Sequence, residues 1–167
     1  DAVRKRRSVY ALSKNSVLPD DSVVAIVREA VKHTPSSYNS QAGRVVVLFG
    51  EQHDRLWDIT RDILKGIVPA DQFKSTEDRM NMFRGAYGTI MFFEDQDVVK
   101  SMQERFPAFK DKFPQYSEHS TGMMQYIVWT ALAVEGIGAS LQHYSPLIDD
   151  AVRKEWDIPA SWKFESQ

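Results

Sequence analysis

The spacing of apolar residues predicts helices and strands in mixed order along the chain. Valine and alanine recur at helical intervals over 21–33, where Asp20 or Asp21 is available as the N-cap, and Pro35 disfavours continuation of that helix. The β-branched, apolar run RVVVLFG at 44–50 is typical of a strand that is covered on both faces. The chain is therefore expected to begin with a helix followed by a buried strand.

The same pattern continues through the middle of the chain. Helices are expected over 51–65, ending at Gly66, and over about 70–84. A second buried strand is expected over 87–95, followed by a helix over 96–106. The stretches between strands are too long and irregular for a simple βαβ repeat.

The last third of the chain combines an aromatic loop with a long apolar helix. A loop predicted at 107–114 carries two phenylalanines and directly follows a third, Phe106. A helix over 117–135 is nearly encircled by apolar residues, which is typical of a core or a subunit interface. A short strand-like segment at 138–144 precedes a helix that has Pro146 near its first turn. No repeat or linker interrupts the sequence, so one α+β or mixed three-layer domain over 1–167 is predicted.

Composition narrows the classes of function without choosing one. The 167 residues suit a single domain, and 43% hydrophobic and 26% charged residues are ordinary for a globular protein. The net charge of −2 lacks the basic field of nucleic-acid binders, and no apolar run approaches the roughly 20 residues of a membrane-spanning helix. The absence of cysteine excludes disulfides and thiolate chemistry. We therefore expect a cytoplasmic protein with no nucleic-acid partner and no membrane association.

Three segments carry groups that suit ligand binding. RKRRSVY at 4–10 places four consecutive cations before a hydroxyl and a phenol, which complement a phosphate and a polar ring edge. TPSSYNSQ at 34–41 joins a helix to a strand and is loaded with short donors and acceptors. EGIGASLQHYSP at 135–146 has glycines that let the backbone approach a ligand closely. Each segment alone also fits an ordinary interpretation: a solvated basic terminus, a polar surface loop, or a lone Gly-x-Gly turn.

The sequence lacks the residue patterns of metal sites and of several common catalytic motifs. The four histidines lie far apart without the paired spacing of metal ligands, so no metal site is expected. The sequence contains no nucleophile elbow, Walker loop or metalloprotease helix. Asp149 and Asp150 are interpreted as carboxylates at the start of a helix rather than as general acid–base catalysts. No residue is therefore assigned a catalytic role.

Four motifs together, in their order and spacing, resemble the nitroreductase family of FMN-dependent oxidoreductases. They are RRSVYALS, TPSSYNSQ, AYGTIMFFED and GIGASLQHYSPLIDDAVRKEWDIP. The resemblance spans nearly the whole chain and is greatest to the short bacterial and fungal branch of the family. It implies an α+β fold, a three-layer α/β/α sandwich around a central mixed, mostly antiparallel sheet. It also implies a homodimer in which each domain is completed by an intertwined partner.

The resemblance further implies two FMN molecules at the subunit interface, each contacted by both chains. One subunit would bind the phosphate and the flavin edge through Arg6, Arg7, Ser8 and Tyr10. The partner would contribute Pro35, Ser36, Ser37, Asn39 and Gln41. The other side of the flavin would be lined by Leu141, Gln142, His143 and Tyr144, with main-chain groups near its reactive nitrogen. Arg79 and Arg84 lie where the family often places a polar or basic flavin contact.

The implied reaction has two steps. NADH or NADPH reduces FMN and leaves, and a nitroaromatic, quinone or related acceptor then enters the same cleft. The lack of a catalytic triad is no objection, because the flavin carries the electron-transfer chemistry. The aromatic residues around Phe106 to Tyr116 are candidates to stack over the acceptor. Two alternatives stay open: a flavin-binding regulator of stress or lipid signalling with little turnover, and a nucleic-acid binder with a basic arm.

Family members usually continue beyond a position like Gln167 with a further strand and a tail over the other subunit. They also have several residues before a position like Asp1. The sequence is therefore expected to lack a few N-terminal residues and the C-terminal strand and tail of such proteins.

Overall fold

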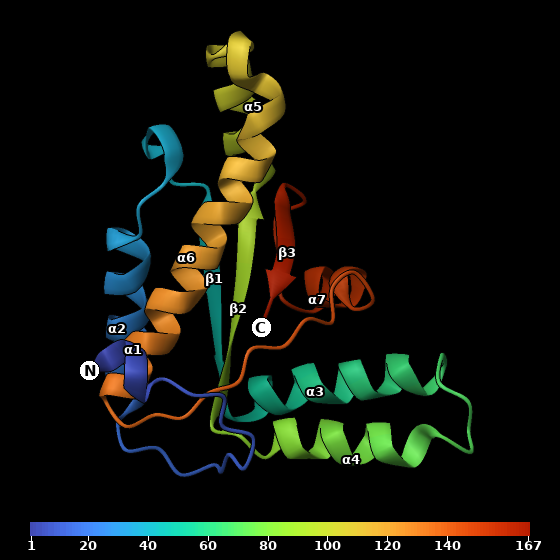
Figure 1. Cartoon of the computed structure of the whole chain (residues 1–167). Helices are drawn as coiled ribbons and strands as arrows, with labels where there is room; N and C mark the ends of the chain where they lie inside the picture. Colours follow the sequence, from blue (N-terminus) through green and yellow to red (C-terminus); the bar gives the residue numbers. More distant parts are fainter.

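A computed structural model describes the whole chain, residues 1–167, and is built around one three-stranded sheet (Figure 1). The strands are β1 (Gly43–Phe49), β2 (Gly88–Asp95) and β3 (Trp162–Ser166), in the spatial order β1-β2-β3. Both pairings are antiparallel, with Val46 opposite Met91 and Phe93 opposite Phe164. The expected α+β fold is confirmed, but these three strands are all antiparallel and the sheet is not mixed.

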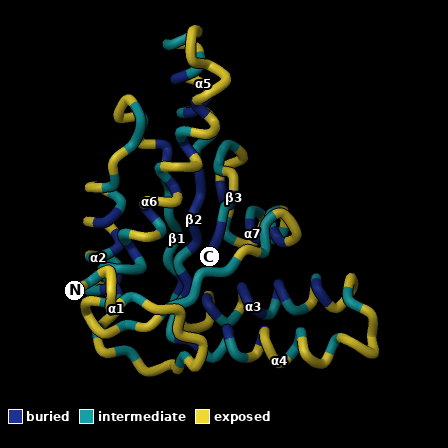
Figure 2. The backbone as a smooth tube through the Cα atoms, viewed as in Figure 1, coloured by how far each residue is buried: buried dark blue, intermediate teal, exposed yellow.

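Helices cover both faces of the sheet, because consecutive strand residues point to opposite sides. Phe93 packs with helices α3 (Gly50–Lys65) and α7 (Asp149–Glu155). Its neighbour Phe92 packs with helices α2 (Asp20–His33) and α6 (Phe113–Val134). The buried positions accordingly lie between the layers (Figure 2). The three-layer arrangement of the prediction is confirmed.

The remaining helices extend the two ends of the sheet. Helix α4 (Phe73–Arg84) packs along α3, and the short helix α1 (Ala2–Lys5) packs on α6. Helix α5 (Gln96–Arg105) and the 3₁₀ helix η2 (Pro107–Lys112) project past the other end of the sheet, where the 3₁₀ turn η1 (Ser37–Asn39) also lies (Figure 1). None of the helices combines the length and the apolar surface that crossing a bilayer requires.

Most of the predicted elements are found within a few residues of their expected bounds. The four helices predicted over 21–33, 51–65, 70–84 and 96–106 and both predicted strands are present. Gly66 ends α3 as expected. Both faces of β1 contact apolar clusters, but β1 is an edge strand, so only Leu48 is fully buried in it.

Several local predictions are wrong. Neither Asp20 nor Asp21 is the N-cap of α2, because Pro19 occupies that position. Both carboxylates lie in the first turn, where they interact favourably with the positive end of the helix dipole. The 107–114 segment is no loop but η2, which runs directly into α6. The 138–144 segment forms a single bridge and no regular strand, and α7 begins at Asp149, three residues after Pro146. Helix α1 and strand β3 were not predicted.

Candidate functional site

The structure joins the basic N-terminal segment to the 135–146 segment. Ser8 and Ala139 form a parallel bridge, in which the Val9 N–H donates to the Ala139 carbonyl over 3.0 Å. Gly138 permits this approach, since a Cβ there would lie 3.1 Å from the Cβ of Val9. Two of the three segments that carry predicted ligand-binding residues are therefore neighbours within one chain.

The four cations that open the chain are not paired with protein carboxylates. No ion pair or side-chain hydrogen bond engages them, and the first such interaction along the chain joins Lys14 to Asp54. The Arg6 guanidinium lies over the Trp129 ring of α6, 4.3 Å from its centroid, and the buried Nε of Arg6 has no hydrogen-bond partner. Arg7, Ser8 and Tyr10 are exposed. Free guanidinium and hydroxyl donors side by side suit an anionic group such as a phosphate.

The backbone of the neighbouring segment offers donors as well. The Gln142 N–H and carbonyl both bond to Gln167, over 2.6 and 3.0 Å, which ties the segment to the end of β3. The N–H groups of Leu141 and His143, which alternate with that of Gln142, donate no backbone hydrogen bond. They are available to a ligand that lies against the side of the segment away from β3.

The other residues that were predicted near this segment differ in their solvent exposure and in their interactions with the protein. His143 is exposed, whereas the Tyr144 ring is half-buried and meets Trp57 edge-on at 5.9 Å. Burial raises the pKa of the Tyr144 phenol, and the nearby cation of Arg79 opposes that rise. Arg84 pairs with Asp58 at 3.1 Å and with Asp54 at 3.4 Å, so it is a structural cation and a poor candidate for a flavin contact.

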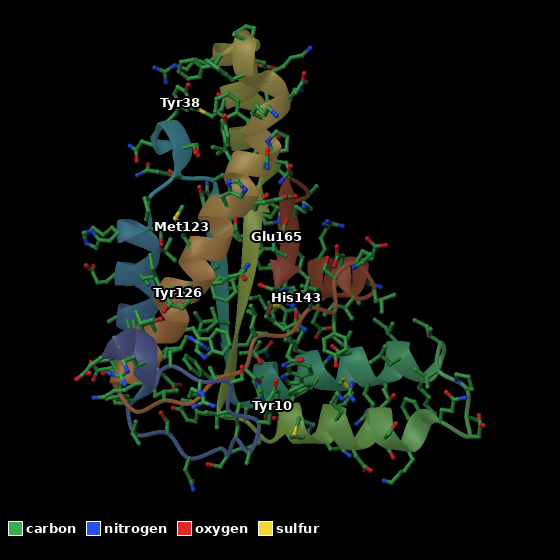
Figure 3. The ribbon with its side chains drawn as sticks, viewed as in Figure 1. Tyr10, Tyr38, Met123, Tyr126, His143 and Glu165 are labelled. Atoms are coloured by element: carbon green, nitrogen blue, oxygen red, sulfur yellow. The ribbon has the colours of Figure 1, made fainter.

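The third predicted segment lies at the opposite end of the molecule. Figure 3 shows Tyr38, in the middle of the 35–41 turn, far from Tyr10. The turn is ordered by its own hydrogen bonds, since Ser36 Oγ accepts from the Gln41 N–H at 3.0 Å and Ser36 O from the Asn39 N–H at 2.9 Å. A single chain therefore does not bring all three segments to one site.

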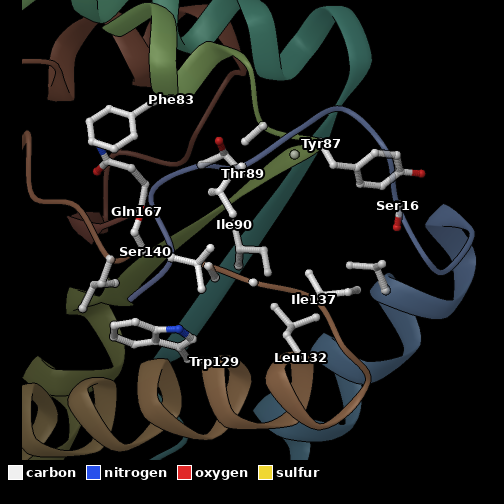
Figure 4. Close-up of a pocket in the computed structure, with 18 of the residues that line it drawn as sticks. Ser16, Phe83, Tyr87, Thr89, Ile90, Trp129, Leu132, Ile137, Ser140 and Gln167 are labelled. Atoms are coloured by element: carbon white, nitrogen blue, oxygen red, sulfur yellow. The ribbon is translucent and has the colours of Figure 1, made fainter. Parts of the chain in front are cut away.

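A cavity of about 330 Å³ lies behind the 138–142 segment (Figure 4). Its walls include Thr89 and Ile90 of β2, Trp129 of α6, and Ile137. No charged side chain lines it. The cavity therefore offers no charged side chain to an anionic group.

A buried histidine network next to this cavity was not found from the sequence. The His53 Nε2–H donates to the Arg84 carbonyl at 3.2 Å, which leaves Nδ1 as an acceptor for the Thr89 hydroxyl at 2.8 Å. The Thr89 oxygen in turn accepts from the Trp57 indole N–H at 3.1 Å. Burial lowers the pKa of His53, against smaller opposing effects from the Arg84 carbonyl and Asp54. Every polar atom of this chain of bonds is satisfied by a neutral His53, so its role is structural.

An adjacent ion pair fastens the N-terminal segment to α3. The Lys14 ammonium reaches both carboxylate oxygens of Asp54, at 2.5 and 2.7 Å. Burial alone would raise the pKa of Asp54, but the hydrogen bond from Lys14 and the charge of Arg84 outweigh it and lower that pKa. The chain that follows the free cations is thus anchored twice, by the bridge at Ser8 and by the ion pair of Lys14.

The fold and this site define an α+β protein that holds unpaired cations and hydroxyls ready for an anionic ligand. The model of the nitroreductase family matches residues 3–166 of the chain. The chain therefore belongs to the nitroreductase family and is an oxidoreductase of that family.

Individual relatives agree in sequence and in structure. Nitroreductase FRM2 of Saccharomyces cerevisiae is 34% identical over 171 residues, covering 100% of this chain and 83% of the yeast protein. Nitroreductase CinD from Lactococcus lactis, in complex with chloramphenicol, is 44% identical with a TM-score of 0.90, covering 99% of this chain and 84% of that one. The FMN-dependent nitroreductase NfnB from Mycobacterium smegmatis, in complex with NADPH, shares the fold at 18% identity, with a TM-score of 0.71 over 99% of this chain and 82% of that one.

Proposed function

We propose that the protein is an FMN-dependent enzyme that takes hydride from NADH or NADPH and reduces nitroaromatic, quinone or related acceptors in a ping-pong reaction. One observation carries the proposal: unpaired cations and hydroxyls at 6–10 lie beside a segment with unpaired N–H groups at 141 and 143. The complexes of CinD with chloramphenicol and with 4-nitrophenol support the class of acceptor. A cytoplasmic location remains part of the proposal.

Each group in the site has a distinct task. Arg6, already oriented by Trp129, and Arg7 bind the phosphate, and the Ser8 hydroxyl donates to it. The N–H groups of Leu141 and His143, which donate no backbone hydrogen bond, would donate to the polar edge of the flavin ring. When bound, FMN supplies the capacity to accept hydride and to pass electrons on. The protein holds FMN in position and surrounds its phosphate with positive charge.

A second copy of the chain completes the proposed site. Tyr38 of the 35–41 turn and Tyr10 of the basic segment lie at opposite ends of the molecule in Figure 3, so we assign the turn to the partner's site. Helix α6 carries an exposed apolar stripe that includes Met123 and Tyr126, each 40% exposed (Figure 3). Such a stripe suits a contact between identical chains.

The acceptor is expected to meet exposed aromatic rings. Phe113 is only 3% exposed and packs with Ala42, Val99 and Met102, so it belongs to the core. Phe109, in η2, is 47% exposed. Among the phenylalanines of 106–113, Phe109 is therefore our candidate to stack on a flat acceptor.

Flavin content and reduction test the proposal directly. The purified protein should be yellow, and NADH or NADPH should bleach the flavin absorbance under anaerobic conditions. A colourless protein that takes up no added FMN would defeat the proposal. Bound FMN that neither nicotinamide reduces would favour the alternative of a flavin-binding regulator.

A paired substitution tests the placement of the phosphate. Arg6→Ala with Ser8→Ala removes charge-assisted bonds worth about 1.5–3 kcal/mol each, enough to strip FMN during gel filtration. Lys5→Ala with Ser13→Ala removes the same kinds of group nearby and should keep the flavin. Stoichiometric FMN in the first variant would show that the anchor is misplaced.

A further inference from the structure

The 35–41 turn has a backbone that its residue types do not favour. Tyr38 has φ 55° and ψ 22°, and Asn39 and Gln41 have φ 52° and 54°. Asparagine tolerates this left-handed region, but a bulky residue such as tyrosine rarely adopts it. The conformation of Tyr38 must therefore be held by something outside the local sequence.

Aromatic packing holds it, from the arm that α5 and η2 form and from Phe113 at the start of α6. The Tyr38 ring lies 4.6 Å from the Phe106 ring and 5.5 Å from the Phe113 ring, measured between centroids. Phe113 is fixed in the core, so the aromatic surface that meets the turn is rigid. The Tyr38 hydroxyl forms no hydrogen bond in the structure, which leaves the ring as the group that anchors the turn.

The remaining polar bonds connect the turn to the base of the same arm. The Arg44 guanidinium donates to the Gln41 carbonyl at 2.8 Å and pairs with Asp95, directly before α5, at 3.0 Å. The Ser36 oxygen is occupied as an acceptor from the Gln41 N–H at 3.0 Å. Its own hydroxyl proton stays free to donate to a ligand. The turn thus has a fixed shape, and the Ser36 hydroxyl is its free donor.

We infer that Tyr38 is a positioning residue, whose ring keeps the 35–41 turn in the one shape that binds the partner's flavin. The inference rests on the proposed function, because it assumes that this turn contacts FMN. If the competent shape is populated only in a fraction of molecules, the apparent dissociation constant rises by the inverse of that fraction. Loss of the anchor should therefore weaken flavin binding without removing any group that touches flavin.

Titration of the apoprotein with FMN, followed by quenching of flavin fluorescence, tests this. Tyr38→Ala and Phe106→Ala should each raise the dissociation constant about tenfold, equivalent to about 1.4 kcal/mol. Tyr38→Phe keeps the ring and should stay within about twofold of the wild type. Tyr38→Gly loses the ring but adopts positive φ freely, so its affinity should fall between those of Tyr38→Phe and Tyr38→Ala.

Coupling between the two rings separates positioning from direct contact. The double variant Tyr38→Ala with Phe106→Ala should bind FMN no more weakly than either single variant, because both remove one anchor. Phe106→Leu keeps apolar volume and serves if Phe106→Ala does not fold. Wild-type affinity in both Phe106 variants, with weakened binding in Tyr38→Ala, would overturn the inference and leave the proposed function standing. A wild-type apoprotein that binds no FMN would overturn both.

Discussion

The Thr89 hydroxyl joins two buried side chains, and its removal gives a stability effect that can be worked out from the structure. Thr89→Val replaces the hydroxyl by a methyl group of similar shape. It leaves His53 Nδ1 without a donor and the Trp57 indole N–H without an acceptor. His53 is 1% exposed and Trp57 4%. Each orphaned group costs about 1–3 kcal/mol, and since Thr89 borders the cavity, where water can enter, we expect about 2–4 kcal/mol in total.

Urea unfolding followed by tryptophan fluorescence, at fixed protein concentration, measures this loss. The expected loss is a large part of the 5–15 kcal/mol typical of domains. Thr89→Ser keeps the hydroxyl and loses one methyl, so it should cost only about 1 kcal/mol. A Thr89→Val protein within about 0.5 kcal/mol of the wild type would refute the network. Equal destabilisation by Ser and Val would do the same.

Three further outcomes follow from other parts of the molecule. Burial holds the pKa of His53 below 6.5, so only the unfolded chain binds that proton, and stability should fall as pH drops below 6.5. In His53→Gln the free energy of unfolding should depend less steeply on pH below 6.5. Equal pH dependence in the wild type and the variant would contradict this prediction. Phe109→Ala should raise the acceptor KM severalfold while NADH still reduces bound FMN at the wild-type rate, in stopped-flow assays. Met123→Glu should yield a monomer in light scattering, and a persistent dimer would exclude the α6 stripe as the interface.

Periodicity predicted the elements whose buried faces repeat over several turns or over an unbroken apolar run. Helix α3 and strand β2 were predicted almost to the residue for this reason. Strand β3 was missed because it has five residues and its partner β2 lies some seventy residues earlier in the chain. The bridge between Ser8 and Ala139 is likewise a long-range pairing that no local pattern encodes.

The sequence indicated candidate residues for the site but not how they lie relative to one another. The motifs of the family pointed to Arg6 and Ser8, yet nothing in the sequence showed that Trp129 would lie under the guanidinium. The left-handed backbone of Tyr38 is equally invisible, because the rings that hold it come from residues near 106 and 113. In both cases the missing information is tertiary contact between segments far apart in the chain.

The separation of the basic segment from the 35–41 turn constrains how two copies can assemble. In a twofold dimer, if a residue of the first chain contacts a second residue in the partner, the same two residues also meet with the chains exchanged. A dimer that brings one turn to the partner's cations therefore brings the other turn to the second set of cations. Two equivalent sites arise, and each takes its cations from one chain and its turn from the other.

This arrangement predicts the behaviour of a mixed dimer. One subunit carries Arg6→Ala with Ser8→Ala, and the other carries Tyr38→Ala, with different affinity tags for purification. If the cations and the turn of a site come from different chains, both defects fall in one site and the other site is intact. Equilibrium titration should then give one FMN of wild-type affinity per dimer. If both segments of a site came from the same chain, each site would carry one defect, and no binding of wild-type affinity would remain.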